Sequence, residues 1–272
     1  MGRNTAQGIS PHRYCSRSTT MKVILNGELI DQKQSLCDER GWMSGTGVFE
    51  TIKTVNNFPW AMSRHMRRAV SSAQRIGMKL PSEDQVRAGV SLLLGAQQFS
   101  SGVLRLSFRD DGCWSAVHFE YEAPSHPAKL FSYEKLIAIQ GQPVKSFPYD
   151  HRLEILKAAQ AQGADEAIVI NDLNRVCEGS VTNLLFQIGG QWVTPPISDG
   201  VLPGIVRALV IENCGVLVRS IALSELPQVS SGFLLSSLRV AQPIASINGR
   251  DLQQSPEFRA QIEAMALRTS VG

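Results

Sequence analysis

The sequence predicts an α+β fold in two domains, and three observations support this prediction. Of the 272 residues, 43% are hydrophobic, which is enough to bury the core of one large domain or two modest ones. Short β-branched runs bounded by turn residues alternate with helix-spaced apolar residues. A loop rich in proline and polar residues at 122–129 separates two unlike halves. We therefore expect a small α/β domain at 21–130 and a larger domain of short strands and helices at 131–272.

Residues 1–20 are expected to lie outside both domains. This segment is polar and basic, contains no acidic residue, and lacks the apolar stretch of a secretion signal. Its composition resembles that of a transit peptide, but Met21, followed by Lys-Val-Ile-Leu-Asn-Gly, is typical of a natural protein start. We interpret 1–20 as a disordered tail, or as the product of a start codon placed too early.

The N-terminal half is predicted to combine hairpins with a pair of helices. Asn26-Gly27 and Asn56-Asn57 are turn signals between β-branched runs. Apolar residues recur at helical spacing over 63–79, where Ser63 is the expected N-cap, and a second helix is expected from 82 to about 96. The strands are expected at 22–25, 48–55, 103–108 and 115–121.

The C-terminal half is predicted to hold shorter strands and tighter turns. Gly141-Gln142-Pro143 breaks a strand expected at 135–140, and Gly163 closes a helix expected at 151–162. Gly189-Gly190 joins two strands as a hairpin. The further elements are expected at 167–170 (strand), 171–174 (turn), 184–188 and 192–194 (hairpin), 205–213 (helix) and 234–235 (strand).

Composition argues against several classes of protein. The formal net charge is +3, from 27 basic and 24 acidic residues, which is not the footprint of a nucleic-acid binder. No apolar stretch reaches the roughly 20 residues of a membrane helix. The five cysteines are scattered without metal or redox spacing, which favours a reducing cytoplasm. We expect a cytoplasmic protein that binds a small molecule and no metal, nucleic acid or membrane.

Lys145 is the first candidate for chemistry. It follows a predicted strand and the Gly-Gln-Pro break, with apolar Val144 and Phe147 nearby. Desolvation in such a setting lowers the pKa of the amine and leaves it nucleophilic. On this pattern alone, a solvated surface lysine is the more frequent explanation.

Three further features point to an anion site and a buried charge. Gly204 precedes a helix whose first N–H groups can face an anion. Arg68, one turn after His65 on a predicted helix, suits bidentate phosphate binding. Glu178, between Cys177 and Gly179 on an expected strand, needs a cationic partner if it is buried. Each feature also has an ordinary structural interpretation. Gly204 can simply mark a loop–helix junction, Arg68 can be a surface cation, and Glu178 can be a solvent-facing strand residue.

Together these segments resemble the fold-type IV enzymes that depend on pyridoxal 5′-phosphate (PLP). This family includes branched-chain aminotransferases, D-amino acid aminotransferases and 4-amino-4-deoxychorismate lyases. The resemblance runs from about Met21 to Gly249, and the motifs occur in the family's order. They are Gly45-Thr46-Gly47-Val48-Phe49-Glu50-Thr51, His65-x-x-Arg68, Lys145-Ser146-x-x-Tyr149, Gly163-Ala164-Asp165-Glu166-Ala167, Glu178-Gly179-Ser180-x-x-Asn183-Leu184, Thr194-Pro195-Pro196, Gly200-Val201-Leu202-Pro203-Gly204-Ile205, and Ser236-Ser237-Leu238-Arg239 with Pro243.

The resemblance implies a role for each matching residue. Lys145 would hold PLP covalently and move protons at the substrate carbon, and Glu178 would pair with the pyridine nitrogen. Tyr149 would hydrogen-bond the phenolic oxygen of the ring. The expected phosphate ligands are Arg68, the backbone N–H groups of Ile205 and Val206, and the Ser237 hydroxyl. A homodimer, with the cofactor between the two domains and near the subunit boundary, is also implied.

Departures from the family pattern bear on the reaction. Val206 stands where many relatives have threonine, Pro148 replaces a common asparagine, and Asp38 or Glu39 fills an Asp-Arg-Gly position imperfectly. Ser44 occupies a position where many aminotransferases carry tyrosine. With the compact length, this favours a lyase that converts 4-amino-4-deoxychorismate to 4-aminobenzoate and pyruvate.

Two other functions remain open. The first is an aminotransferase acting on branched-chain or D-amino acids, and the second is a non-catalytic binding protein that keeps the fold. Arg105 and Arg109, on or beside the 103–108 strand, are candidates for binding a substrate carboxylate. Arg109 is equally well explained as a loop cation.

Overall fold

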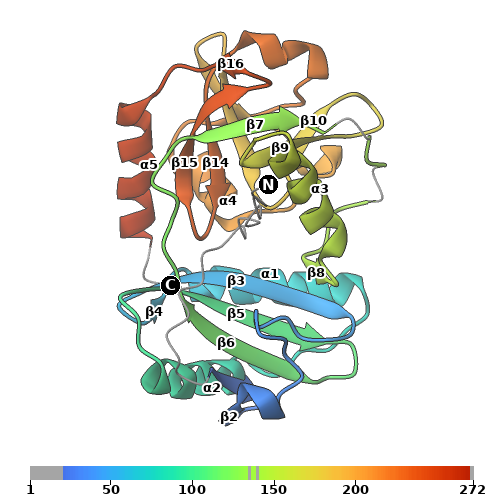
Figure 1. The fold of residues 1–272 in the computed structure, drawn as a ribbon, viewed down its shortest axis with the longest axis vertical. Helices are drawn as coiled ribbons and strands as arrows, with labels where there is room; N and C mark the ends of the chain where they lie inside the picture. Colours follow the sequence, from blue (N-terminus) through green and yellow to red (C-terminus); the bar gives the residue numbers. More distant parts are fainter. Residues whose placement is uncertain (1–20, 134–135, 139–140, 270–272) are drawn as a thin grey trace, which may run out of the picture.

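The computed structural model describes residues 21–133, 136–138 and 141–269 (Figure 1). The predicted tail at 1–20 lies outside the described residues. Within the described ranges, no helix is long and apolar enough to cross a membrane. The chain forms an α+β fold with two sheets, as predicted, and Figure 1 shows one sheet with its helices below the other.

The first sheet is built almost entirely from the N-terminal half of the chain. Among the described residues it has seven strands in the order β2-β1-β6-β5-β3-β4, with β8 added beside β3, and all its pairings are antiparallel. Helix α1 packs against β3, and α2 against β1 and β6. The elements are β1 (Lys22–Leu25), β2 (Glu28–Asp31), η1 (Gln32–Gln34), β3 (Gly47–Val55), β4 (Phe58–Pro59), α1 (Met62–Arg75), α2 (Glu83–Ala96), β5 (Ser101–Arg109), β6 (Trp114–Glu120) and β8 (Ser146–Phe147).

The second sheet is mixed and belongs to the C-terminal half. Its nine described strands run in the order β10-β9-β7-β15-β14-β11-β12-β13, with β16 beside β15. Helix α3 packs against β9, α4 against β14, and α5 against β15. The elements are β7 (Ala128–Ser132), α3 (Asp150–Ala161), β9 (Glu166–Ile170), β10 (Val176–Gly179), β11 (Asn183–Ile188), β12 (Gln191–Thr194), η2 (Ile197–Asp199), α4 (Ile205–Asn213), β13 (Leu217–Val218), η3 (Leu223–Gln228), β14 (Val229–Ser236), β15 (Val240–Ile247), β16 (Arg250–Asp251) and α5 (Pro256–Arg268).

The two halves pack against each other through apolar side chains and one indole hydrogen bond. Trp60, just after β4, is buried with residues of α4 and α5, and its Nε1 donates to the carbonyl of Ala266 at 2.9 Å. Strand β8, from the second half of the chain, pairs with β3 of the first sheet. This crossing carries the segment around residue 145 to the junction between the sheets. Because β7 has all its strand partners in the second sheet, we propose that the domain boundary precedes Ala128 rather than following residue 130.

The prediction for the first helix is wrong at both ends. Helix α1 begins at Met62, so Ser63 lies inside it, and the N-cap is Ala61 in a left-handed conformation with φ 52°. The left-handed conformation is unfavourable for alanine, but the packing of the buried Ala61 in the junction between the halves holds it in place. The helix ends at Arg75 rather than Lys79, since Gly77 at φ 73° leaves the helical conformation. In contrast, the predicted start of α2 is confirmed: the Ser82 side chain accepts a hydrogen bond from the Gln85 N–H.

The strand predicted at 135–140 is not a regular element in the part that is described. Residues 135, 139 and 140 lie outside the described residues, and within 136–138 only Ile137 forms a bridge, to Asn171. The regular strand is β7, which begins inside the loop predicted at 122–129. The short strand predicted at 234–235 is the end of the longer β14, and β15 and α5 were not predicted.

Candidate active site

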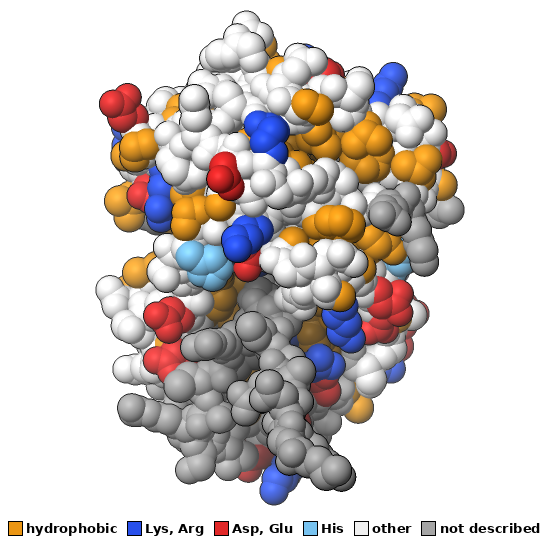
Figure 2. Space-filling model, turned by 45° about the horizontal axis from the view of Figure 1, so that its top comes forward, with side chains coloured by type: hydrophobic (Ala, Val, Ile, Leu, Met, Phe, Trp, Pro, Cys, Tyr) orange, Lys and Arg blue, Asp and Glu red, His pale blue; other side chains and the backbone are white. Residues whose placement is uncertain are grey.

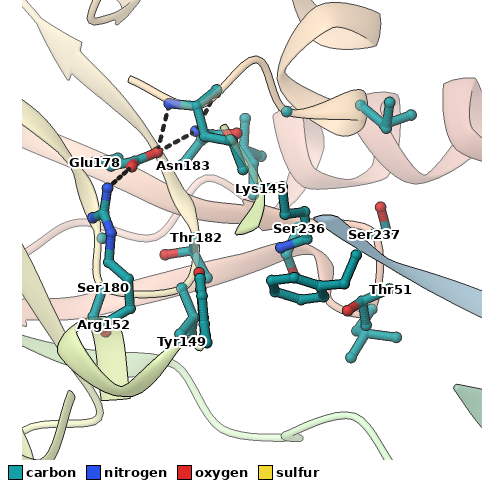
Figure 3. Close-up of a pocket in the computed structure, with 18 of the residues that line it drawn as sticks. Thr51, Lys145, Tyr149, Arg152, Glu178, Ser180, Thr182, Asn183, Ser236 and Ser237 are labelled. Atoms are coloured by element: carbon teal, nitrogen blue, oxygen red, sulfur yellow. Dashed lines mark hydrogen bonds and ion pairs between the residues drawn. The ribbon is translucent and has the colours of Figure 1, made fainter. Parts of the chain in front are cut away.

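A pocket of about 170 Å³ lies at the junction of the two halves (Figure 3). Its walls come from β3, α1, β5, α3, β10, α4 and the end of β14, and from the segments that precede β8 and follow β14. It brings together residues that are far apart in the sequence. The predicted site residues that line it are Arg68, Arg105, Lys145, Tyr149, Glu178, Ile205, Val206 and Ser237.

Lys145 lies in the pocket, directly before β8. Its carbonyl accepts a hydrogen bond from the Phe49 N–H at 2.9 Å, which ties this segment to β3. Its Nζ lies 4.3 Å from the centroid of the Phe49 ring and 5.3 Å from that of Tyr149. Burial, reinforced by the nearby Arg68 guanidinium, lowers the pKa of Lys145 to about 7, although the Glu50 and Glu178 carboxylates act in the opposite direction. A substantial fraction of this amine is therefore neutral and nucleophilic at neutral pH.

We expect the lowered pKa of Lys145 to set the pH at which the PLP-free protein reacts with an aldehyde. Only the neutral amine attacks, so the rate should rise with pH up to about 7 and then level off. An ordinary lysine would instead continue to gain about tenfold per unit up to its pKa of roughly 10.4. Stopped-flow absorbance after mixing with PLP at pH 6–9 measures this rate. A rate that is still climbing tenfold per unit between pH 8 and 9 would contradict the assignment.

Glu178 occupies one side of the pocket, on β10, and is only 4% exposed. Its carboxylate accepts hydrogen bonds from Arg152 Nη2 at 2.6 Å, Asn183 Nδ2 at 3.1 Å and the Leu202 N–H at 2.9 Å. Burial raises the pKa of Glu178, while the Arg152 charge and the Leu202 N–H oppose that rise. This buried acid therefore has the cationic partner that its burial requires.

Arg152 and Asn183 are site residues whose roles were not predicted from the sequence. Arg152 comes from the first turn of α3, and its Nη1 is buried with no hydrogen-bond partner among the described residues. The burial of Glu178 called for a cation, but helix 151–162 also carries Lys157, and only the packing of α3 on β9 selects Arg152.

Arg68 is held in the pocket by a buried carboxylate. Its Nε and Nη2 donate to the two oxygens of Glu50 at 2.8 and 2.6 Å, and its Nη1 donates to the Pro203 carbonyl at 3.2 Å. His65 Nδ1 lies 2.6 Å from the same carboxylate. The Arg68 charge and the His65 contact outweigh burial and hold the pKa of Glu50 at about 2. Glu50 and His65 belong to the sequence motifs, but their mutual contact depends on α1 packing against β3.

Replacing Arg68 by alanine should destabilise the protein. Glu50 is fully buried, so removing its guanidinium partner leaves an uncompensated carboxylate, at a cost of about 3–5 kcal/mol. Urea unfolding measures the loss. Arg67→Ala is the matched control, because Arg67 is the neighbouring arginine on α1 and is exposed. If both variants unfold at the same urea concentration, the buried pair contributes nothing to stability.

The N-terminus of α4 supplies backbone donors to the pocket. Gly204 is its N-cap and has no side chain, and a Cβ added there would overlap Oδ1 of Asn183. The Asn183 amide in turn donates to the Leu202 carbonyl at 3.0 Å as well as to Glu178. Ile205 and Val206 open the helix, so their N–H groups have no partner within it and are available to an anion.

Tyr149 contacts an aromatic wall of the pocket that is formed by Trp42 and Phe49. Its ring stacks on Trp42 with centroids 5.9 Å apart and meets Phe49 edge-on at 5.0 Å. Burial raises the pKa of Tyr149 to about 12. The hydroxyl is therefore protonated at neutral pH and can donate a hydrogen bond to an oxyanion.

The two predicted carboxylate ligands are placed differently. Arg105 is buried in the pocket wall, where its Nη1 donates to the Arg40 carbonyl at 2.8 Å and its Cζ lies 3.8 Å from the centroid of the Trp42 ring. Arg109 ends β5, is not among the residues that line the pocket, and pairs with Asp111 at 2.7 Å. Arg239, which received no role from the sequence, does line the pocket, with Nη1 3.1 Å from Gln242 and 3.8 Å from Glu166.

These groups fit PLP. In Figure 3, Glu178 and Arg152 lie to one side of Lys145, and Ser236 and Ser237 lie to the other. A nucleophilic amine thus stands between a buried carboxylate that suits a ring nitrogen and a cluster of cation, hydroxyl and helix N–H donors that suits a phosphate. The bound cofactor would supply an electron sink for a carbanion next to the substrate nitrogen. The fold and this site define a PLP-dependent enzyme.

Comparison with known proteins identifies the family. The sequence profile of the class IV aminotransferases matches residues 47–247, and the chain belongs to this family of fold-type IV PLP enzymes. It is 27% identical over 258 residues to a D-alanine aminotransferase of Bacillus licheniformis, covering 85% of this chain and 90% of the relative. It is 22% identical over 213 residues to an aminodeoxychorismate lyase of Bacillus subtilis, covering 70% and 73%. The crystal structure of a branched-chain aminotransferase from Thermoproteus uzoniensis superposes with a TM-score of 0.82 at 24% identity, covering 93% of this chain and 97% of that one.

Proposed function

We propose that the protein is a PLP-dependent lyase that converts 4-amino-4-deoxychorismate to 4-aminobenzoate and pyruvate. The observation that carries the proposal is the pair of guanidinium groups, Arg105 and Arg239, in the pocket that holds Lys145. The substrate has two carboxylates, so it needs two cations beyond those that bind the phosphate. Similarity to the Bacillus subtilis lyase and the serine at position 44 also support the proposal.

In this reaction the residues of the chain would bind the substrate and move its proton. Arg105 and Arg239 would each bind one carboxylate, and the aromatic wall of Trp42 and Phe49 would exclude water. The Lys145 amine would take the proton from the carbon that bears the substrate nitrogen. The substrate would then lose its enolpyruvyl group as enolpyruvate, which is protonated to pyruvate. The ring that remains is aromatic, and aromatisation supplies driving force.

The test is to supply 4-amino-4-deoxychorismate to the purified protein without any keto acid. Appearance of equal amounts of pyruvate and 4-aminobenzoate supports the lyase. Arg239→Gln should raise KM for this substrate, whereas Arg109→Gln should leave it unchanged because Arg109 is outside the pocket. Absence of pyruvate, together with amino-group exchange on alanine or a branched-chain amino acid, would reject the proposal.

An aminotransferase acting on D-amino or branched-chain amino acids is the second candidate. Greater identity to the D-alanine aminotransferase of Bacillus licheniformis than to the Bacillus subtilis lyase favours it. A non-catalytic role for the fold is tested by absorbance, because a protein that holds PLP on a lysine has a visible band that borohydride removes.

We also propose that the protein works in the cytoplasm as a homodimer, on a small-molecule substrate. On the face shown in Figure 2, the described acidic and basic side chains are interspersed.

A further inference from the structure

A chain of three buried or half-buried groups runs from the first sheet into the phosphate end of the pocket. Glu50 and His65 are both 0% exposed, and His65 Nδ1 lies 2.6 Å from the Glu50 carboxylate. On the other side of the ring, His65 Nε2 lies 3.2 Å from Oγ of Ser237, which lines the pocket. The imidazole is therefore in contact with a carboxylate at one nitrogen and a phosphate-site hydroxyl at the other.

The contacts of Glu50 decide where the His65 hydrogen is. Glu50 also accepts two hydrogen bonds from Arg68, and the pKa of Glu50, about 2, keeps it ionised, so it can only accept. His65 Nδ1 must carry a hydrogen. Burial lowers the pKa of His65, so the ring is neutral at neutral pH and its Nε2 is an acceptor. In this state the Ser237 hydrogen points to His65, and a lone pair of Ser237 faces the pocket.

That arrangement is unsuited to a phosphate. A serine whose single hydrogen is engaged by His65 presents an oxygen lone pair to the phosphate oxygens, which also carry negative charge. If His65 Nε2 gains a proton, it becomes the donor, and the Ser237 hydrogen is free to turn to the phosphate. We propose that His65 is a positioning residue of the phosphate site that takes up one proton from solvent when a phosphate dianion binds, and so turns the Ser237 hydroxyl toward the phosphate.

The charges around His65 act in opposite directions on its protonation, and a bound phosphate dianion would favour the protonated ring. Glu50 on β3 favours the protonated ring, whereas Arg68 on α1 and Lys145 before β8 oppose it. A phosphate at Ser237 adds a negative charge on the Nε2 side of the ring and neutralises Arg68. Linkage then requires that PLP binds more tightly as pH falls, by up to tenfold per unit, between the pKa of His65 without phosphate and its higher pKa with phosphate.

The inference rests on the PLP site but on neither proposed reaction, and it is tested on the holoenzyme. Nitrogen-15 NMR of labelled histidine distinguishes protonated from unprotonated ring nitrogens. In the holoenzyme at pH 7 we expect both nitrogens of His65 to be protonated, and only Nδ1 after PLP is removed. The chain has five histidines, and the His65 signal is the one that responds to Ser237→Ala.

Ser237→Ala should uncouple His65 from the phosphate. In that variant the pH midpoint of His65 in the holoenzyme should fall toward its value without PLP, and PLP affinity should lose the part of its pH dependence that depends on this proton. Ser230→Ala, which removes a hydroxyl of β14 that lies outside the pocket, should retain both. The titration of Lys145 also changes PLP affinity with pH, but it does so equally in the unaltered protein and in the two serine variants. Its effect therefore cancels when these three proteins are compared.

The outcomes distinguish failure of the cofactor site from failure of the proton uptake by His65. A protein with no visible band and no bound PLP would refute the cofactor site itself. Bound PLP with a neutral His65 at pH 6–8 would overturn the proton uptake while leaving the cofactor site intact. Should Ser237→Ala fail to bind PLP, the protonation state of His65 in the unaltered holoenzyme still decides.

Discussion

Lys145→Ala is expected to abolish turnover and the visible absorbance band while the protein stays folded. The buried amine is the group in the pocket that can bond to an aldehyde and then move a proton, and such a group contributes about 10²–10⁴-fold to a rate as an acid or base alone. We expect kcat to fall by at least about 10³-fold. Unfolding should occur at the same or a higher temperature, because the substitution removes an amine that is costly to bury.

Lys53→Ala is the control for this variant. Lys53 is a partly buried lysine on β3 whose pKa burial also lowers, but it does not line the pocket. It should keep both the visible band and the turnover. Full activity in Lys145→Ala, measured as pyruvate release or amino-group exchange, would refute the assignment of Lys145 for either reaction.

Local chemistry in the sequence was sufficient to predict much of the fold. Helix α4 matches its predicted range of 205–213, and the turns at Asn26-Gly27 and Asn56-Asn57 are present, because glycine and asparagine tolerate positive φ. Ser63 failed as an N-cap because a tertiary contact, the burial of Trp60 and Ala61 against α4 and α5, decides where α1 begins. Strand β15 has a proline within it and no strict alternation, so its strand character depends on its partners β7 and β14.

The site shows the same division between local and tertiary information. Motifs predicted the residue types that line the pocket, but hydrogen-bond partners such as Arg152 follow from packing. Arg105 and Arg109 lie on the same face of β5, since they are four positions apart, yet that spacing moves Arg109 about 13 Å along the strand. There it meets Asp111 in the turn instead of the pocket.

Glu178→Gln is expected to reduce kcat by about 10²–10³-fold with a smaller effect on PLP binding. The neutral amide keeps the size of the side chain and can still accept from Asn183 and Leu202, but it cannot hold a proton on a ring nitrogen by charge. The electron sink would weaken although Lys145 and the phosphate ligands are untouched. Steady-state kinetics and PLP titration measure the two effects separately.

The control for Glu178→Gln has to remove an equivalent ion pair elsewhere. Glu225→Gln breaks the 2.9 Å contact of Glu225 with Arg219, which lies outside the pocket. This variant should change neither kcat nor PLP binding. Glu178→Asp should recover part of the lost kcat, since it restores the charge at a shorter reach. If Glu178→Gln instead bound PLP much more weakly while its kcat per bound PLP was unchanged, Glu178 would act as an anchor for the cofactor and not through the charge on its ring nitrogen. If the Glu178 carboxylate had only a structural role, Glu178→Gln would not lose kcat alone, and Glu178→Asp would not recover part of that kcat. The results for Glu178→Gln, Glu178→Asp and Glu225→Gln together therefore decide whether the buried pair of Glu178 and Arg152 acts in catalysis or only in the structure.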